Sequence, residues 1–255
     1  MLKPLALTAA LALSPPAHAF DWEGLLKGAA GQQDSVTTSS PAPASSGAVD
    51  ALSSSEVNGG LKEALSRGAV AAVTQLGAKD GFFGNEALRI PLPKPLKKAE
   101  KAMRLFGMGQ QADDLVLGMN RAAEAAVPEA RTLLVDAVKS MTLTDAKGIL
   151  TGGKTSATDF FRAKTEAKLT ERFGPIVKKT TDKVGLAQKY NRYAGLAVQY
   201  GVADKTQATV EQYVTQQALD RLYTVIGEKE AAIRANPLQA GSDLLKKVFG
   251  AVAGK

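Results

Sequence analysis

The chain has 255 residues, a formal net charge of +7, no cysteine and a single histidine, His18. The absence of cysteine excludes disulfides, thiol nucleophiles, thiolate metal sites and an acylated N-terminal cysteine. Because His18 lies in the leader described next, the mature chain would also lack a Ser-His-Asp triad and any histidine-ligated metal or haem. The composition therefore predicts neither a metal nor a cofactor, and the positive charge favours acidic partners.

Residues 1–19, MLKPLALTAALALSPPAHA, have the layout of a secretory signal peptide. Lys3 gives a positive start, an apolar run follows, and Ala17-His18-Ala19 forms a small-x-small cleavage site. The apolar run is too short to span a bilayer, and no later stretch has the length of a membrane span. The sequence predicts an exported, periplasmic protein, with secretion as the alternative, that is neither transmembrane nor a lipoprotein.

Two regions follow the leader. Residues 20–54 are rich in serine, alanine, proline and glycine, a composition that indicates a flexible linker. In residues 55–252 apolar residues recur at helical spacing, and no alternating run bounded by turns indicates a strand. The predicted fold class is all-α, an irregular multi-helix bundle in a single domain.

The expected helices are read from apolar spacing, caps and breakers. In chain order they are a helix stopped by Gly77, one from Pro95 to Gly107, one through Leu115 and Met119 ending near Pro128, one through Leu133 to Met141, a short one from Thr144 to Leu150, one capped by Thr158 and kinked at Gly174-Pro175, and segments around 186–200, 207–235 and 242–252.

One segment, DGFFGNEALRIPLPKP at 80–95, departs from the helical pattern. Its glycines flank two phenylalanines, and apolar residues alternate from Leu88 to Leu92 among arginine and prolines. The prolines exclude a central strand but permit an extended segment laid across helices. Phe82 and Phe83 are candidates for a membrane wedge or a ligand gate, although burial between helix ends is the commoner role of such residues.

Residues 148–155, GILTGGKT, match the phosphate-binding pattern G-x-x-x-x-G-K-[ST] letter for letter. A functional phosphate-binding loop lies between a β-strand and a helix, so that backbone amides and the helix dipole converge on phosphate. Here the preceding residues, MTLTDAKGIL, indicate a helix instead. We therefore expect Gly152-Gly153 to stop one helix and the next helix to begin just after, with no nucleotide bound.

The predicted helix GMNRAAEAAVPEA is the segment densest in polar groups of interest, with Asn120, Arg121 and Glu124 close together on its surface. If Asp136 or Asp145 lay nearby, Glu124 would gain a second carboxylate for acid–base hydrolysis at a defined separation. The commoner role of such groups is a network that pins neighbouring helices. The candidate ligand or interaction residues are Phe82, Phe83, Asn120, Arg121, Glu124, Asp136 and Asp145.

A basic stripe runs along the predicted helix after Pro95. Such a helix suits an anionic lipid surface, an envelope protein or a polyanion, but more often its apolar side faces the core and its lysines face water. Few aromatic residues accompany the stripe, which argues against nucleic-acid binding. The stripe consists of Lys94, Lys97, Lys98, Lys101 and Arg104, with Leu96, Ala99, Met103 and Phe106 opposite.

Six segments occur in an order that resembles a bacterial exported family catalogued as domain of unknown function 4197. They are GLKEAL (60–65), DGFFGNEALRIPLP (80–93), NRAAEAAVPEA (120–130), MTLTDAKGIL (141–150), YVTQQALDRLY (213–223) and IRANP…LLKKVFG (233–250). The resemblance covers residues 52–250 and implies a single helical domain behind a signal peptide. It brings no established activity or site residues, and Lys154 is not part of the family pattern.

The residues favour a non-catalytic binding or scaffolding module over an enzyme, because they lack the common catalytic and metal-binding motifs. Two alternatives stay open. One is a carrier of an apolar or lipid-like ligand that uses Phe82, Phe83 and the helix interior. The other is a hydrolase that uses only carboxylates, with Glu124 paired with Asp136 or Asp145.

Overall fold

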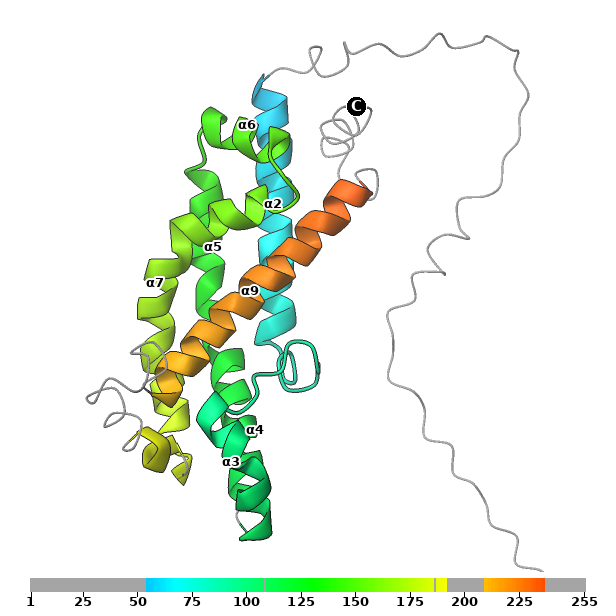
Figure 1. The fold of residues 1–255 in the computed structure, drawn as a ribbon. Helices are drawn as coiled ribbons and strands as arrows, with labels where there is room; N and C mark the ends of the chain where they lie inside the picture. The colour runs from blue at the N-terminus through cyan, green and yellow to red at the C-terminus, as the bar shows by residue number, and fades with distance from the viewer. Residues whose placement is uncertain (1–53, 108, 186, 192–208, 237–255) are drawn as a thin grey trace, which may run out of the picture. The chain divides into compact units, whose positions relative to one another are not determined.

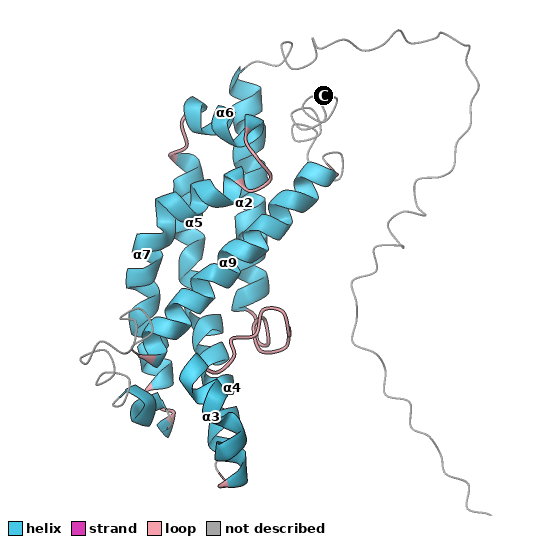
Figure 2. Ribbon diagram, in the orientation of Figure 1, coloured by secondary structure: helices cyan, strands magenta, loops and turns pink. Residues whose placement is uncertain are grey.

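The computed structural model describes residues 54–107, 109–185, 187–191 and 209–236. The regular secondary structure in these ranges is entirely helical, as predicted (Figure 2). The predicted leader, the linker up to residue 53 and the helix at 242–252 lie outside the described residues, as does most of the segment around 186–200.

The helices follow the predicted order with small shifts at their ends. Their bounds are α2, Ser54–Gly77; α3, Lys94–Leu105; α4, Gly109–Ala126; the 3₁₀ turn η2, Val127–Glu129; α5, Ala130–Lys139; α6, Leu143–Thr151; α7, Ser156–Thr181; and α9, Val210–Ala235.

Helix ends are set by local side chains. Thr142 caps α6 in a capping box with Asp145, in which each side chain accepts the other residue's backbone N–H. Thr209 caps α9 by accepting the N–H of Gln212. After α3, Gly107 takes a φ of +73°, a left-handed conformation that glycine adopts without a Cβ penalty, and the chain turns into α4.

The helices pack around one apolar core. α7 packs on α9 and α4, and α2 packs on α5 and α9. In Figure 1 α9, drawn in orange, runs obliquely across α2 and α4. α4 contributes small residues to the core: Ala112, Ala122, Ala123 and Ala126 are completely buried, and such small side chains let neighbouring backbones approach closely. No helix among the described residues combines the length and apolarity needed to cross a bilayer.

One expectation for α7 needs correction. The helix begins at Ser156 with Thr155 at the cap position, so Thr158 lies inside the first turn rather than at the cap. It also continues through Gly174-Pro175 to Thr181. Phe173 and Val177, on either side of the proline, are completely buried, so tertiary packing keeps this stretch helical despite the missing N–H of the proline.

The segment between α2 and α3 is non-helical and extended at its end, as predicted. Leu88, Ile90 and Leu92 are all buried, so the alternating residues face the core. The turn before them is tight, because a Cβ on Gly81 would lie 2.4 Å from the carbonyl oxygen of Gln75. We call residues 80–93 the strap.

Candidate functional site

The buried carboxylate of Glu124 binds the backbone of the strap. Its Oε1 accepts the N–H groups of Phe82 and Phe83, each at 3.1 Å, and its Oε2 accepts from Arg121 at 2.5 Å. The residue is only 5% exposed. One side chain on α4 thus satisfies two amides that no helix or strand can satisfy, which is what a buried charge requires to be tolerated.

Arg121 links the same carboxylate to the surface of the strap. Its guanidinium donates to Asp80 at 2.7 Å and lies over the ring of Phe83, which Arg89 also faces. Hydrogen bonds to Glu124 and to Asp80 raise the pKa of Arg121 above its ordinary value. Asp80 itself has a φ of +66°, which is uncommon for a residue with a side chain. The ion pair helps to fix that turn.

Asn120 pairs with Ile90 as a neighbouring strand would. Its Oδ1 accepts the Ile90 N–H at 2.8 Å, and its Nδ2 donates to the Ile90 carbonyl at 2.9 Å and to the Val116 carbonyl at 2.7 Å. Asn120 is completely buried. The amide side chain therefore replaces the sheet partner that an extended segment lacks in an all-helical core.

Two side chains of α9 hold the strap from its other side. The Tyr213 hydroxyl donates to the carbonyl of Pro91 at 3.1 Å, and Arg221 donates to the carbonyl of Arg89 at 3.1 Å and to the side chain of Gln217. Burial lowers the pKa of Arg221 and raises that of Tyr213. The Nε of Arg221 is buried without a partner. The strap is thus fixed between α4 and α9.

The other two candidate carboxylates have local partners of their own. Asp145 accepts from the backbone N–H and the hydroxyl of Thr142 in the α6 capping box, and these bonds lower its pKa. Asp136 lies on the surface of α5, 3.5 Å from the ammonium of Lys139. Neither Asp136 nor Asp145 bonds to Glu124, and the described residues contain no cluster of three or more potential metal ligands.

The two phenylalanines of the strap differ in their surroundings. Phe82 is completely buried in the core, whereas Phe83 is half-buried between the guanidinium groups of Arg89 and Arg121. A buried ring cannot act as an exposed wedge, so only Phe83 offers part of its ring to a partner.

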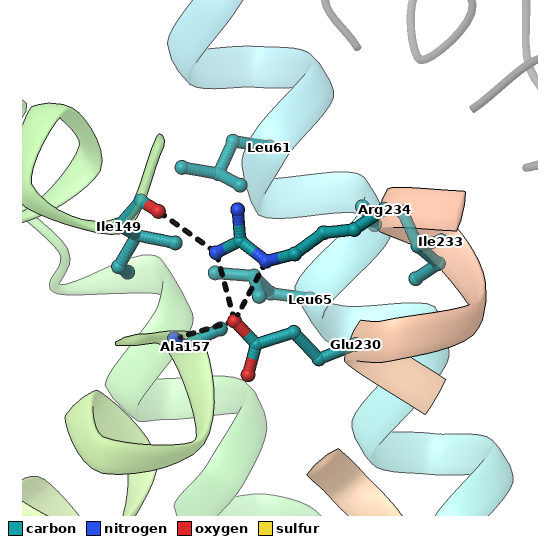
Figure 3. A pocket seen from close by; sticks show the side chains of 8 residues that line it. Leu61, Leu65, Ile149, Ala157, Glu230, Ile233 and Arg234 are labelled. Atoms are coloured by element: carbon teal, nitrogen blue, oxygen red, sulfur yellow. Dashed lines mark hydrogen bonds and ion pairs between the residues drawn. The ribbon is translucent and has the colours of Figure 1, made fainter. Parts of the chain in front are cut away.

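The GILTGGKT motif forms a helix–turn–helix junction, as predicted. Two N-terminal amides of α7, at the helix end that a phosphate-binding loop would offer to its ligand, already have an acceptor. Glu230 of α9 accepts the N–H groups of Ala157 at 3.0 Å and Thr158 at 2.9 Å. Arg234 donates to Glu230 and to the carbonyl of Ile149, so it ties the end of α6 to the same carboxylate (Figure 3).

Small hollows lie beside this junction, between α2, α9 and the start of α7. In Figure 3 Leu61 and Leu65 of α2 face the Glu230–Arg234 pair across one of them. Two such hollows have volumes of about 20 Å³ each. This is room for about one water molecule, whereas small-molecule pockets measure roughly 300–1,000 Å³.

Lys154→Ala is expected to change neither folding nor nucleotide affinity. Lys154 is exposed, and two amides in the adjacent first turn of α7, those of Ala157 and Thr158, are already satisfied by Glu230. The free energy of unfolding should stay within about 0.5 kcal/mol of wild type. Calorimetric titration with magnesium-ATP should give no binding heat for either protein, and binding that the substitution abolishes would overturn this interpretation.

Sequence reasoning missed the residues that reach between elements. Glu230 and Arg234 have the spacing of an ordinary surface ion pair on a helix. The position of Glu230 could have indicated its burial. It lies seven residues after Tyr223 and four after Ile226, and therefore on the buried side of α9. Tyr213 and Arg221 gave no comparable signal, because their acceptors are strap carbonyls far away in sequence.

Fold and contacts define a class: an all-helical domain whose buried polar side chains bind backbone groups of its own strap and helix ends. The family model described as "Protein of unknown function (DUF4197)" matches residues 51–250, and the chain belongs to this family. No curated protein and no solved structure matches the chain.

Proposed function

We propose that this protein is an exported, periplasmic module that acts by binding or scaffolding rather than by catalysis. The observation that carries the proposal is the use of the candidate polar groups. The strap takes up hydrogen bonds from three of them, Glu124, Arg121 and Asn120. A side chain that is already hydrogen-bonded within the protein is poorly placed to bind substrate or to transfer protons.

A scaffolding role fits the rigidity that these contacts give. The strap is bonded on one side to α4 and on the other to α9, so the segment would present a fixed surface to a partner. A preformed surface reduces the ordering cost of association. The proposal of export depends on the leader at residues 1–19.

Native mass spectrometry of the chain purified from the periplasm of its own host tests this proposal. We expect the mass of a chain that begins at Phe20, without a small organic ligand bound in a fixed ratio. A lipid-like ligand retained at one per chain would replace the proposal with a carrier. A chain that still begins at Met1 and stays in the cytoplasm would contradict export.

A further inference from the structure

The tip of the α3–α4 hairpin exposes two adjacent large apolar side chains. Leu105, the last residue of α3, is 86% exposed and Phe106 is 80% exposed. The sequence pattern had placed Phe106 on the core-facing side of α3, which is wrong: the helix ends at Leu105, and none of the described helices covers its end. Leu117 and Leu143 are exposed singly elsewhere, which is ordinary for a protein surface.

Exposed lysines lie behind this apolar tip. Lys94, Lys98, Lys101 and Leu105 follow one another at spacings of four, three and four residues. At this helical spacing all four lie on one side of α3. Lys97 lies beside them. Within the described part of the chain, none of these lysines forms an ion pair with a carboxylate.

Two of the three acidic residues near the tip share one cation, Arg104. Arg104 binds both Glu100, at 2.9 Å, and Asp113 of α4, at 2.7 Å, so these two carboxylates have Arg104 rather than a lysine as their partner. The nearby carboxylate of Asp114 accepts from the Gln110 side chain. Residues 94–114 carry five cationic side chains against three carboxylates, so the hairpin keeps a net positive charge, and its four lysines form no ion pair with the described carboxylates.

We propose that the α3–α4 tip docks on an anionic phospholipid surface, with Leu105 and Phe106 entering the interface and the lysines binding lipid phosphates. The helical rise of about 1.5 Å per residue places Lys101 roughly 6 Å and Lys98 roughly 10 Å behind Leu105. Apolar side chains of peripheral helices enter the headgroup and acyl boundary by roughly 5–10 Å, which leaves these ammonium groups at phosphate depth.

The packing of α3 on α4 determines how the hairpin can approach a bilayer. The apolar side of the helix, with Met103 buried, packs on α4, so α3 cannot lie flat with that side in the bilayer. The hairpin therefore approaches by its tip. A bilayer explains both features together, since it offers negative phosphates directly above an apolar layer.

Vesicle flotation of the full-length mature chain tests the docking. We expect binding to vesicles that contain phosphatidylglycerol, weak binding to pure phosphatidylcholine, and loss of binding as salt rises. Leu105→Ser with Phe106→Ser should lower the affinity by about tenfold or more, because the apolar contact is removed. The matched control, Leu117→Ser with Leu143→Ser, removes two exposed leucines elsewhere and should bind like wild type.

A charge-reversal pair tests the electrostatic half. Lys98→Glu with Lys101→Glu should lower the affinity for the anionic vesicles by about tenfold or more. The control, Lys147→Glu with Lys168→Glu, makes the same change in net charge at exposed positions of α6 and α7. Equal losses in both pairs would show an effect of net charge alone and overturn the assignment to the tip.

This assignment rests on the proposed binding function, but the two fail in different experiments. A retained stoichiometric ligand in the mass spectrum contradicts the binding module and leaves vesicle binding unaddressed. Absence of binding to either vesicle contradicts the lipid surface, and it would leave the exposed tip to a protein partner instead.

Discussion

Glu124→Ala is expected to lower the free energy of unfolding by about 3 kcal/mol. The substitution leaves the buried N–H groups of Phe82 and Phe83 without an acceptor and removes the carboxylate that holds Arg121. The loss should appear in urea unfolding followed by far-UV circular dichroism. It combines two unsatisfied donors, the loss of one of the two carboxylate partners of Arg121, and the space vacated by the side chain.

Glu129→Ala is the matched control for this substitution. Glu129 lies in the 3₁₀ turn after α4 and is exposed, with only a 3.5 Å surface contact to Arg172. Its loss should change stability by at most about 0.5 kcal/mol. If both variants unfold at the same urea concentration as wild type, the buried carboxylate does not hold the strap.

Glu230→Ala is expected to cost a similar amount, about 3 kcal/mol. The first turn of α7 loses the carboxylate that accepts the amides of Ala157 and Thr158. A negative charge at this end of a helix also interacts favourably with the helix dipole. Arg234 would lose its carboxylate partner, and its hydrogen bond to the carbonyl of Ile149 at the end of α6 would weaken.

Glu228→Ala serves as the control on the same helix. Glu228 is exposed two residues earlier in α9, so its removal should leave the urea midpoint nearly unchanged. Amide hydrogen exchange adds a local measurement. In the Glu230→Ala variant, Ala157 and Thr158 should exchange much faster than in wild type, and unchanged protection there would contradict the proposed contact.

Most of the fold was predictable because helices are encoded by local spacing. The stripe through Leu61, Leu65 and Leu76 predicts α2, and the glycines after Leu150 predict the α6–α7 junction. The misplaced start of α7 has a simple cause. Thr158 looks like a cap residue, but its amide and hydroxyl bind Glu230, more than seventy residues away, and no local pattern reports that.

The candidate polar cluster was predictable only in part. Its members on α4 were identified as a network expected to pin neighbouring helices. They bind the strap instead, because the strap is the extended segment whose buried backbone groups lack partners. Asn120 is completely buried and pairs with both backbone groups of Ile90, a geometry that depends on a register between α4 and the strap that spacing alone does not set.

Amide hydrogen exchange of the wild-type strap tests most directly whether this cluster is structural. We predict that the N–H groups of Phe82, Phe83 and Ile90 open only with free energies near that of global unfolding, because Glu124 and Asn120 accept them in the core. The exposed amide of Glu86 should exchange far faster. If the Phe82 and Ile90 amides exchanged as fast as that of Glu86, the strap would open easily, and the polar groups beneath it would be available to a ligand.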